Sequence, residues 1–132
     1  MTIDENKAIV RAWVKAWVEN APVAVDDLFA EDYTVNGVVV GQQGVKQAMQ
    51  LLHSALSDIS MELKDLIAEG DKVTARWVVR GMHSGELMGM PATNRFVEFR
   101  GINIYQIMDG RIAANDEQTN VLEVTQGLKA GT

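Results

Sequence analysis

The stretch from Lys72 to Gly101 constrains the fold most, because its side chains alternate like those of two long strands joined by a loop. On the first of these strands, the side chains of one face are all apolar: Val73, Ala75, Trp77 and Val79. The other face mixes apolar groups with arginines: Thr74, Arg76, Val78 and Arg80. An arginine on the inward side of a sheet needs a partner, because a buried guanidinium without one is costly. If Arg76 faces inward, the pattern therefore predicts a partner for it on a neighbouring element.

Length and composition set the class of protein. The chain has 132 residues, which predicts one domain over residues 1–132 with an ordered core over about 3–124. Its formal net charge of −6 argues against a nucleic-acid partner, since phosphate binding needs a basic surface. There is no cysteine, and the two histidines, His53 and His83, fall on separate elements. We therefore expect neither a thiolate site nor a zinc site.

The sequence also lacks the usual signals for membranes and export. Its apolar runs are much shorter than the roughly 20 residues that cross a bilayer, so no membrane partner is expected. The N-terminal sequence MTIDENKAIV is acidic and lacks the basic start and apolar run of a signal peptide. We therefore expect a cytoplasmic protein.

The order of the predicted elements indicates an α+β fold. Helices are predicted from Thr2 to Asn20 and over about 23–29 and 43–57. A strand begins at Tyr33, and four more are predicted over 59–68, 72–80, 95–107 and 111–122. The first of these four is expected to contain a bulge near residues 64–65. Hairpin turns are predicted at 69–71 and 109–110, and the tail over 123–132 is expected to be weakly ordered.

Helices first and a meander of antiparallel strands after them are typical of α+β domains. A curved antiparallel sheet that wraps around the N-terminal helices leaves a cone with a pocket inside. We expect this pocket between the concave face of the sheet and the first and third helices.

Several segments resemble a known family. They are 28–33 (LFAEDY), 70–73 (GDKV), 81–86 (GMHSGE), 89–93 (GMPAT) and 109–112 (DGRI). With the order of elements, these segments resemble the SnoaL-like polyketide cyclases, also called ester cyclases, of the nuclear-transport-factor-2-like superfamily. The resemblance covers nearly the whole chain, and the loop over 81–93 is its most specific part.

The resemblance implies a cone-shaped, cystatin-like α+β barrel with a deep apolar pocket, no cofactor and assembly through the outer face of the sheet. Members of this superfamily close rings by aldol chemistry, shift double bonds or open epoxides, each by acid–base catalysis on a small apolar substrate. Its members also include non-catalytic binders, so the fold alone does not fix the activity.

The chain departs from the family pattern at the positions that usually carry the chemistry. The usual catalytic aspartate, ten residues after the glycine of the Asp-Gly turn, is Asn120 here, and an amide cannot act as a general base. The histidine or aspartate at the end of the first strand is replaced by Asn36 and Gly37, and the usual tryptophan of the last strand by Asp116.

Asp116 is the candidate base. On the last strand Asp116, Gln118 and Asn120 alternate onto one face, so Asp116 faces the pocket if Asn120 does and no bulge intervenes. Limonene epoxide hydrolase uses an aspartate–arginine–aspartate arrangement. Its arginine matches Arg76, and its aspartates match Val78 and Asn120. Asp116 is therefore a candidate partner for Arg76, either as a base in the pocket or as a structural or solvated carboxylate.

The remaining candidates each have a structural alternative. His83 in the family motif either donates a proton to the substrate or stabilises its loop. Tyr33 and Asn36, with Asn120, are candidates to polarise a carbonyl or hold a water, although alternation sends at most one of Tyr33 and Asn36 inward unless the strand bends at Gly37. The expected pocket wall or core contains Trp13, Trp17 and Met49, and Met88 lies in a methionine-rich loop that is a candidate lid.

Two functions follow from these residues. The first is a cofactor-independent isomerase, cyclase, lyase or hydrolase acting on a small apolar, oxygenated molecule. Asp116 is then the base and Arg76 its partner, while Asn120, Tyr33 and His83 are polar anchors. The second is a non-catalytic small-ligand-binding module that has lost its acid. In either case the apolar row that begins at Val73 is expected on the outer face, as the interface of a homodimer.

Overall fold

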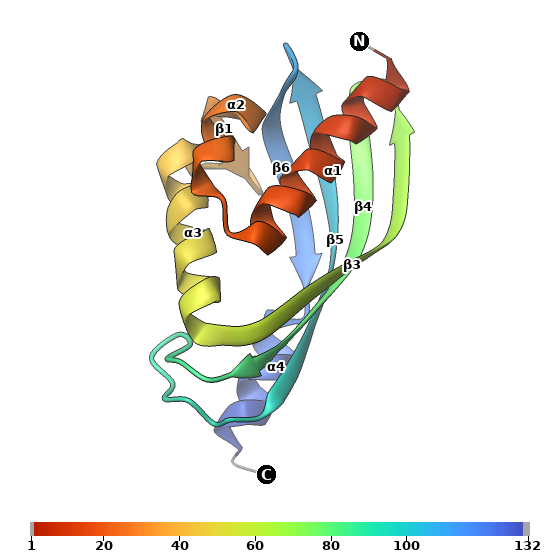
Figure 1. Cartoon of the computed structure of the whole chain (residues 1–132). Helices are drawn as coiled ribbons and strands as arrows, with labels where there is room; N and C mark the ends of the chain where they lie inside the picture. Colours follow the sequence, from red (N-terminus) through yellow and green to blue (C-terminus); the bar gives the residue numbers. More distant parts are fainter. Residues whose placement is uncertain (1, 131–132) are drawn as a thin grey trace.

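The computed structural model describes residues 2–130 and confirms the α+β class (Figure 1). Its elements in chain order are α1 (Ile3–Glu19), a 3-10 turn η1 (Pro22–Ala24), α2 (Val25–Leu28), β1 (Phe29–Val35), β2 (Val38–Val39), α3 (Gly41–Ala55), β3 (Leu56–Glu69), β4 (Lys72–His83), β5 (Phe96–Met108), β6 (Arg111–Thr119) and α4 (Val121–Lys129). Figure 1 shows α1 and α3 against one side of a strongly bent sheet. We call this concave side the inner face and the opposite side the outer face.

The strands form one sheet in the order β2-β1-β6-β5-β4-β3. Strands β3 to β6 pair as the predicted antiparallel meander. β1 pairs with β6 in parallel, so the first strand of the chain lies beside the last one. Because β2 and β3 remain as edges, the sheet is an open cone rather than a closed barrel.

Local signals fix the ends of α1. The Thr2 side chain accepts a hydrogen bond from the Glu5 backbone, and the Glu5 carboxylate accepts one from Thr2, which is a capping box. Asn20 ends the helix with a left-handed φ of 53°, and Pro22 follows. Within residues 2–130, none of the helices is long and apolar enough to cross a membrane.

Residues with positive φ close the hairpins. Gly70 (φ 59°) turns β3 into β4, and Asp109 (52°) with Gly110 (75°) turns β5 into β6, as predicted. The pair Asn36 and Gly37 makes the same kind of turn between β1 and β2. The predicted bulge in β3 is confirmed by a register shift between residues 63 and 65.

The core lies between the helices and the inner face, and it corrects one prediction. Val73, Ala75 and Val79 of β4 are 0%, 1% and 4% exposed and belong to the core. The expectation that their row forms an outer dimer interface is therefore wrong. The helices cover the concave side, so the all-apolar side of β4 is the side that packs against them, and the arginine row faces outward.

The tail is also more ordered than predicted. Residues 121–129 form helix α4, which follows β6 directly and lies beside the lower end of β5 (Figure 1). Leu128 is 6% exposed and joins the core, with Val121 and Val124 packed against it. The spacing of these residues at three and four positions gives one apolar stripe, which anchors the helix beyond the expected limit near residue 124.

Candidate functional site

Four polar side chains gather on the inner face of β5 and β6: Asn103, Tyr105, Asn115 and Glu117. In the strand register Asn103 lies opposite Glu117, and Tyr105 lies opposite Asn115. Asn103, Tyr105 and Asn115 are 4–6% exposed, whereas Glu117 is half-buried. A polar patch of this size inside an otherwise apolar core is costly to fold, so it is a candidate functional site.

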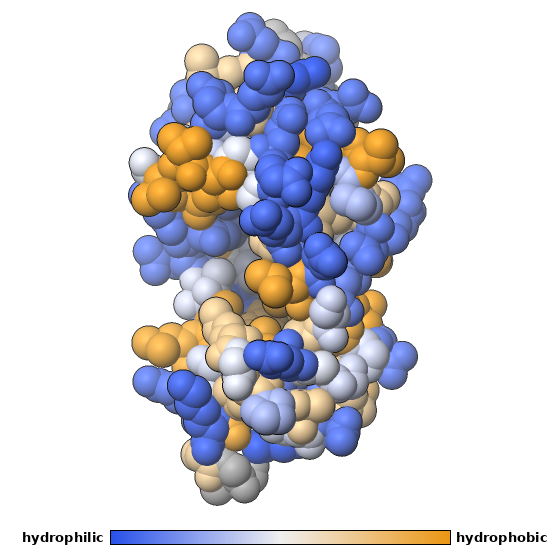
Figure 2. Space-filling model, turned by 90° about the vertical axis from the view of Figure 1, so that its left-hand side faces the viewer, coloured by the Kyte–Doolittle hydropathy of each residue, from blue (hydrophilic) through white to orange (hydrophobic). Residues whose placement is uncertain are grey.

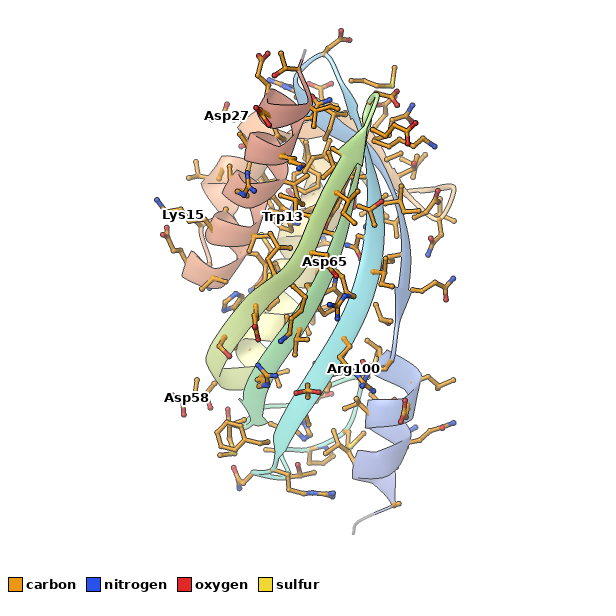
Figure 3. All side chains as sticks on the ribbon, turned by 90° about the vertical axis from the view of Figure 1, so that its right-hand side faces the viewer. Trp13, Lys15, Asp27, Asp58, Asp65 and Arg100 are labelled. Carbon is orange, nitrogen blue, oxygen red and sulfur yellow. The ribbon has the colours of Figure 1, made fainter. Side chains whose placement is uncertain are left out.

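β1 adds a fifth polar group, the hydroxyl of Tyr33. Val35 of β1 pairs with Asn115 of β6, and Tyr33 lies two residues earlier on the same side of β1. The Tyr33 ring is 4.8 Å from that of Phe29, which is 4.7 Å from that of Trp13, both in edge-to-face geometry. Figure 3 shows Trp13 between α1 and the strands. An aromatic wall therefore flanks the polar patch.

Two sets of hydrogen bonds order the patch. Trp77 donates from Nε1 to Asn103 Oδ1 at 3.1 Å, and Asn103 Nδ2 donates to the Tyr105 hydroxyl oxygen at 2.8 Å. Asn115 Nδ2 donates to Glu117 Oε2 at 3.4 Å. Asn115 Oδ1 is buried and has no partner among the described residues. A buried acceptor without a donor marks a place for a ligand or a water.

Both tyrosines are neutral at pH 7. Burial raises the pKa of Tyr105 to about 12, and the Glu117 charge acts in the same direction, while the hydrogen bond from Asn103 opposes it. Burial also raises the pKa of Tyr33, helped by Tyr105 and Glu117. Each hydroxyl thus keeps its proton and can donate it to a hydrogen bond.

Glu117 is the carboxylate of this patch, and its position is fixed through its backbone. The Asn36 side chain accepts from Glu117 N at 2.9 Å and donates to Glu117 O at 3.5 Å. Asn36 N also donates to Asn115 O at 2.8 Å. The ion pairs found within residues 2–130 do not include Glu117. The patch therefore combines one carboxylate without a cationic partner and two neutral tyrosines.

The predicted pairing of Arg76 with Asp116 is wrong. Arg76 Nε donates to Asp65 Oδ2 of β3 at 2.6 Å on the outer face, where both side chains are about half exposed. Figure 3 shows Asp65 on the side of the strands that looks away from the helices. Asp116 is exposed and lies opposite Ile104, also on the outer face. Because Arg76 alternates with the buried row of β4, it cannot reach the inner face.

The other residues predicted on that row are also outside the patch. Val78 is buried but shares the side of β4 that carries Arg76, and Gln118 is exposed on the side of Asp116. Asn120 accepts from Arg100 N at 2.7 Å and donates to Glu98 O at 3.3 Å, so its amide extends the pairing of β5. Alternation counted back from Asn120 therefore predicted the wrong side chains of β6, Asp116 and Gln118, on the inner face.

His83 is the last residue of β4, and its side chain contacts the loop that follows this strand. Thr93 N donates to His83 Nδ1 at 3.3 Å, and the Thr93 hydroxyl lies 2.9 Å from the same nitrogen. The backbone of His83 bonds to Arg95 and Asn94. Ala75 of β4 lies in the same cross-strand row as Asn103 and Glu117. His83 lies eight residues further along β4, so roughly 26 Å of strand separates it from the polar patch. The loop-stabilising alternative fits this geometry, although His83 Nε2 is buried without a partner within residues 2–130.

Other predicted wall residues are spread over the molecule. Tyr33 and Trp13 border the patch, as described above, and Asn36 supports it. Trp17 is 7% exposed and lies 5.1 Å from the His53 ring, and Met49 is 1% exposed in the core. Met88 is 72% exposed at the tip of its loop, at a left-handed φ of 50°. Trp17 and Met49 therefore lie in the core, and Met88 does not cover the patch.

Two surface hollows lie outside the patch. One, of about 460 Å³, is lined by polar side chains of α3 and the end of α1, among them Asn20, Gln47 and His53. The other, of about 490 Å³, lies at the Gly70 hairpin. Neither is lined by Asn103, Tyr105, Asn115 or Glu117. Figure 2 shows a further hollow halfway down one side, between the upper part of the molecule and the lower part, where α4 lies in Figure 1.

Sequence reasoning missed Asn103, Tyr105, Asn115 and Glu117. The signal for β5 was present, since alternation from the apolar residues Val97 and Phe99 places Asn103 and Tyr105 on the same face. The signal for β6 was hidden, because a register shift near Ile107 separates Ile112 from Asn115 by an odd number of residues, although both are buried. No cluster of three or more His, Asp or Glu side chains suited to a metal occurs within residues 2–130.

Comparisons with known proteins agree on the family and the fold. Residues 7–128 match the model of the SnoaL-like polyketide cyclase family. The structure of TsrD from Streptomyces laurentii is similar with a TM-score of 0.87 and 27% identity, covering 97% of each chain. A SnoaL-like polyketide cyclase from Agrobacterium tumefaciens gives 0.81 and 16% over 97% of this chain and 99% of that one.

IdmH from Streptomyces antibioticus gives a TM-score of 0.81 and 23% identity over 94% of this chain and 98% of that one. At this identity the likeness concerns the fold. A comparison with curated proteins finds no match.

Proposed function

This chain belongs to the SnoaL-like polyketide cyclase family, and from that premise we propose that it is a cyclase or isomerase that moves protons on a small, mostly apolar, oxygenated molecule. One observation carries the proposal. Glu117 is a half-buried carboxylate on the inner face, with two neutral tyrosines nearby and Asn36 fixing its backbone. Glu117 therefore takes the role that the sequence assigned to Asp116.

The groups of the patch suit enolate chemistry. Glu117 removes a proton from a carbon next to a carbonyl, and the electron pair moves to the carbonyl oxygen. The hydroxyls of Tyr33 and Tyr105 donate hydrogen bonds to the negative charge that develops on that oxygen. In a cyclase the enolate carbon then attacks a second carbonyl, and the alkoxide that forms takes the proton back from Glu117. In an isomerase the conjugated enolate takes that proton back at a different carbon.

A second candidate function is hydrolysis, for example of an epoxide. The specific observation is Oδ1 of Asn115, which has no hydrogen-bond partner in the part of the chain that the structure describes, while Nδ2 of the same amide bonds to Glu117. An amide oxygen and a carboxylate side by side can hold one water and take its proton as it attacks an epoxide carbon. The C–O bond of the epoxide breaks in this step, and the released oxygen takes the proton back from Glu117. Product formed in ¹⁸O-labelled water separates the two reactions, because only hydrolysis adds the label.

We also propose a homodimer through the outer face, with a different set of residues from the one expected. Ile67, Ile102 and Ile104 are 64%, 47% and 41% exposed. The register places Ile67 and Ile104 in one row across the sheet and Ile102 in the next. Apolar side chains in neighbouring rows of a sheet form a continuous surface that a second copy can cover.

Neighbouring carboxylates on opposite faces provide the test of the catalytic proposal. We would incubate the protein in D₂O with a panel of cyclic ketones, aromatic β-keto esters and epoxides, and follow loss of the α-hydrogen signal by NMR. Glu117→Gln should lower exchange by about 10²- to 10⁴-fold, the usual contribution of a general base. Asp116→Asn is the matched control and should leave the rate unchanged.

The same experiment can contradict the proposal. If Asp116→Asn lowered the exchange rate and Glu117→Gln did not, the general base would be Asp116 on the outer face. Binding of panel members without exchange or opening by the wild type would favour the ligand-binding module over an enzyme.

A further inference from the structure

The Trp77 indole packs over the neighbouring strand, where a glycine leaves room for it. Gly101 of β5 is the register partner of Trp77. A Cβ atom at Gly101 would lie 2.2 Å from Trp77 Cζ2, far inside van der Waals contact. The indole therefore occupies the space of the missing side chain. In this position its Nε1 reaches Asn103, two residues further along β5.

The indole settles the orientation of the Asn103 amide. An indole N–H is a donor only, so the Asn103 atom that faces it at 3.1 Å is the oxygen. The NH₂ group must then point to the other side, where it donates to the Tyr105 hydroxyl oxygen at 2.8 Å. A rotation of the amide by half a turn would place NH₂ against the indole N–H and lose that bond. It would also bring Oδ1 to the Tyr105 hydroxyl, which would then donate its proton to Asn103 and have none to give to a ligand. Asn103 is 6% exposed, so solvent does not replace the lost bond.

The bond from Asn103 leaves Tyr105 with a proton to give. The hydroxyl oxygen uses one lone pair to accept from Asn103, and no described residue accepts a hydrogen bond from this hydroxyl. Tyr105 lies opposite Asn115, one row from Glu117. An accepted hydrogen bond also polarises an O–H group and makes it a stronger donor.

We infer that Trp77 and Asn103 are positioning residues that hold the Tyr105 hydroxyl as an obligate hydrogen-bond donor, and that the ligand presents a carbonyl oxygen to it. The inference rests on the proposed function, in which the carbonyl oxygen of the ligand gains negative charge when Glu117 removes a proton. It makes Tyr105 the principal oxyanion donor of the site, and it explains why β5 needs a glycine at position 101.

Binding of 2-naphthol tests the inference without turnover. Its ionised form is a flat aromatic oxyanion that resembles an enolate, and its fluorescence distinguishes the ionised from the neutral form. Tyr105→Phe should weaken binding by about tenfold or more, the usual effect of losing a charge-assisted hydrogen bond. Asn103→Asp should weaken it equally, because a carboxylate between Trp77 and Tyr105 accepts a hydrogen bond from the Tyr105 hydroxyl, which then has no proton left for the ligand.

Trp77→Phe and Gly101→Ala should each weaken binding by about threefold, because both free the Asn103 amide to rotate. Trp77→Phe is a mild change that should preserve the fold. A double-mutant cycle distinguishes positioning from general damage: in the Tyr105→Phe background, Asn103→Asp should have no further effect on affinity. Additive losses in that background would overturn the positioning role.

The outcomes for this inference and for the proposed function are separate. Glu117→Gln should retain or strengthen binding of ionised 2-naphthol, since it removes a neighbouring negative charge, while it lowers exchange by about 10²- to 10⁴-fold. Wild-type affinity in Tyr105→Phe, or failure of the wild type to bind 2-naphthol, would overturn the donor role of Tyr105. Wild-type affinity in Asn103→Asp would overturn the role of Asn103, whatever Glu117→Gln does to exchange.

Discussion

Tyr33 and Tyr105 are the two tyrosines of the chain, and both are buried on the inner face. Burial raises the pKa of each, that of Tyr105 to about 12. An unfolded chain releases its tyrosine protons near pH 10. Between these values the unfolded state has lost protons that the folded state keeps, so stability should fall as the pH rises from about 10 to about 12.

Tyrosinate absorbance and far-UV circular dichroism, followed together across this range, check the expectation. Ionisation and unfolding should coincide, and Tyr105→Phe should make the alkaline loss of stability less steep. Ionisation of both tyrosines near pH 10 with an unchanged dichroism spectrum would show that their hydroxyls are open to solvent.

The candidate site shows how far residue patterns carry. Alternation along β4 correctly separated an apolar row from the row of Arg76, and the question of a partner for Arg76 was sound, since Asp65 answers it. The error was the choice of inner row, made by matching Arg76 and Asn120 to residues of relatives. A match of position in a sequence does not carry the face with it, because one residue more or fewer in a strand reverses every side chain.

Helix α4 is the element whose stability is easiest to isolate. Leu128 is 6% exposed, whereas Leu122 on the same helix is 70% exposed. Leu128→Ala should lower the free energy of unfolding by about 2 kcal/mol or more, because it leaves a space in the core. Leu122→Ala is the matched control and should change it by less than about 0.5 kcal/mol. Urea denaturation measures both, and equal small effects would mean that α4 adds little to the fold.

Elements with local signals were predictable, and elements that depend on distant contacts were not. The cap at Thr2, the turns at Gly70 and Gly110 and the bulge near Lys64 all lie where their residues indicate. α4 was missed because its stripe is short and becomes informative only once the lower end of β5 is there to receive it.

His53 gives a similar lesson on α3. It lies off the apolar stripe of the helix, a position that is typical of solvated side chains. In the structure its Nε2 lies 2.6 Å from Trp17 O, in the last turn of α1. A side chain that bonds a terminal helix carbonyl stabilises that end of the helix. Such a contact joins two helices across 36 positions of sequence and leaves no periodic trace.

At the scale of the whole molecule, the proposed dimer can be tested with one substitution. Ile104 lies near the middle of the outer face and is 41% exposed. Ile104→Asp should convert a dimer to a monomer, because it places a desolvated charge in the interface. Leu51→Asp, on α3 where Leu51 is 70% exposed, is the control and should remain a dimer. Light scattering reports both masses, and a monomeric wild type at micromolar concentration would contradict the proposal.

β3 has a consequence for how the protein behaves at high concentration. It is the last strand of the sheet, so one side of its backbone has no strand partner over 14 residues. Register shifts after residues 57 and 63 interrupt it, and its exposed side chains include Glu62, Lys64, Asp65 and Glu69. These features keep a strand from another molecule from zipping onto it. A β3 straightened by deletion of Lys64 and stripped of its charges would lose that protection, and the domain would then polymerise edge to edge into fibres.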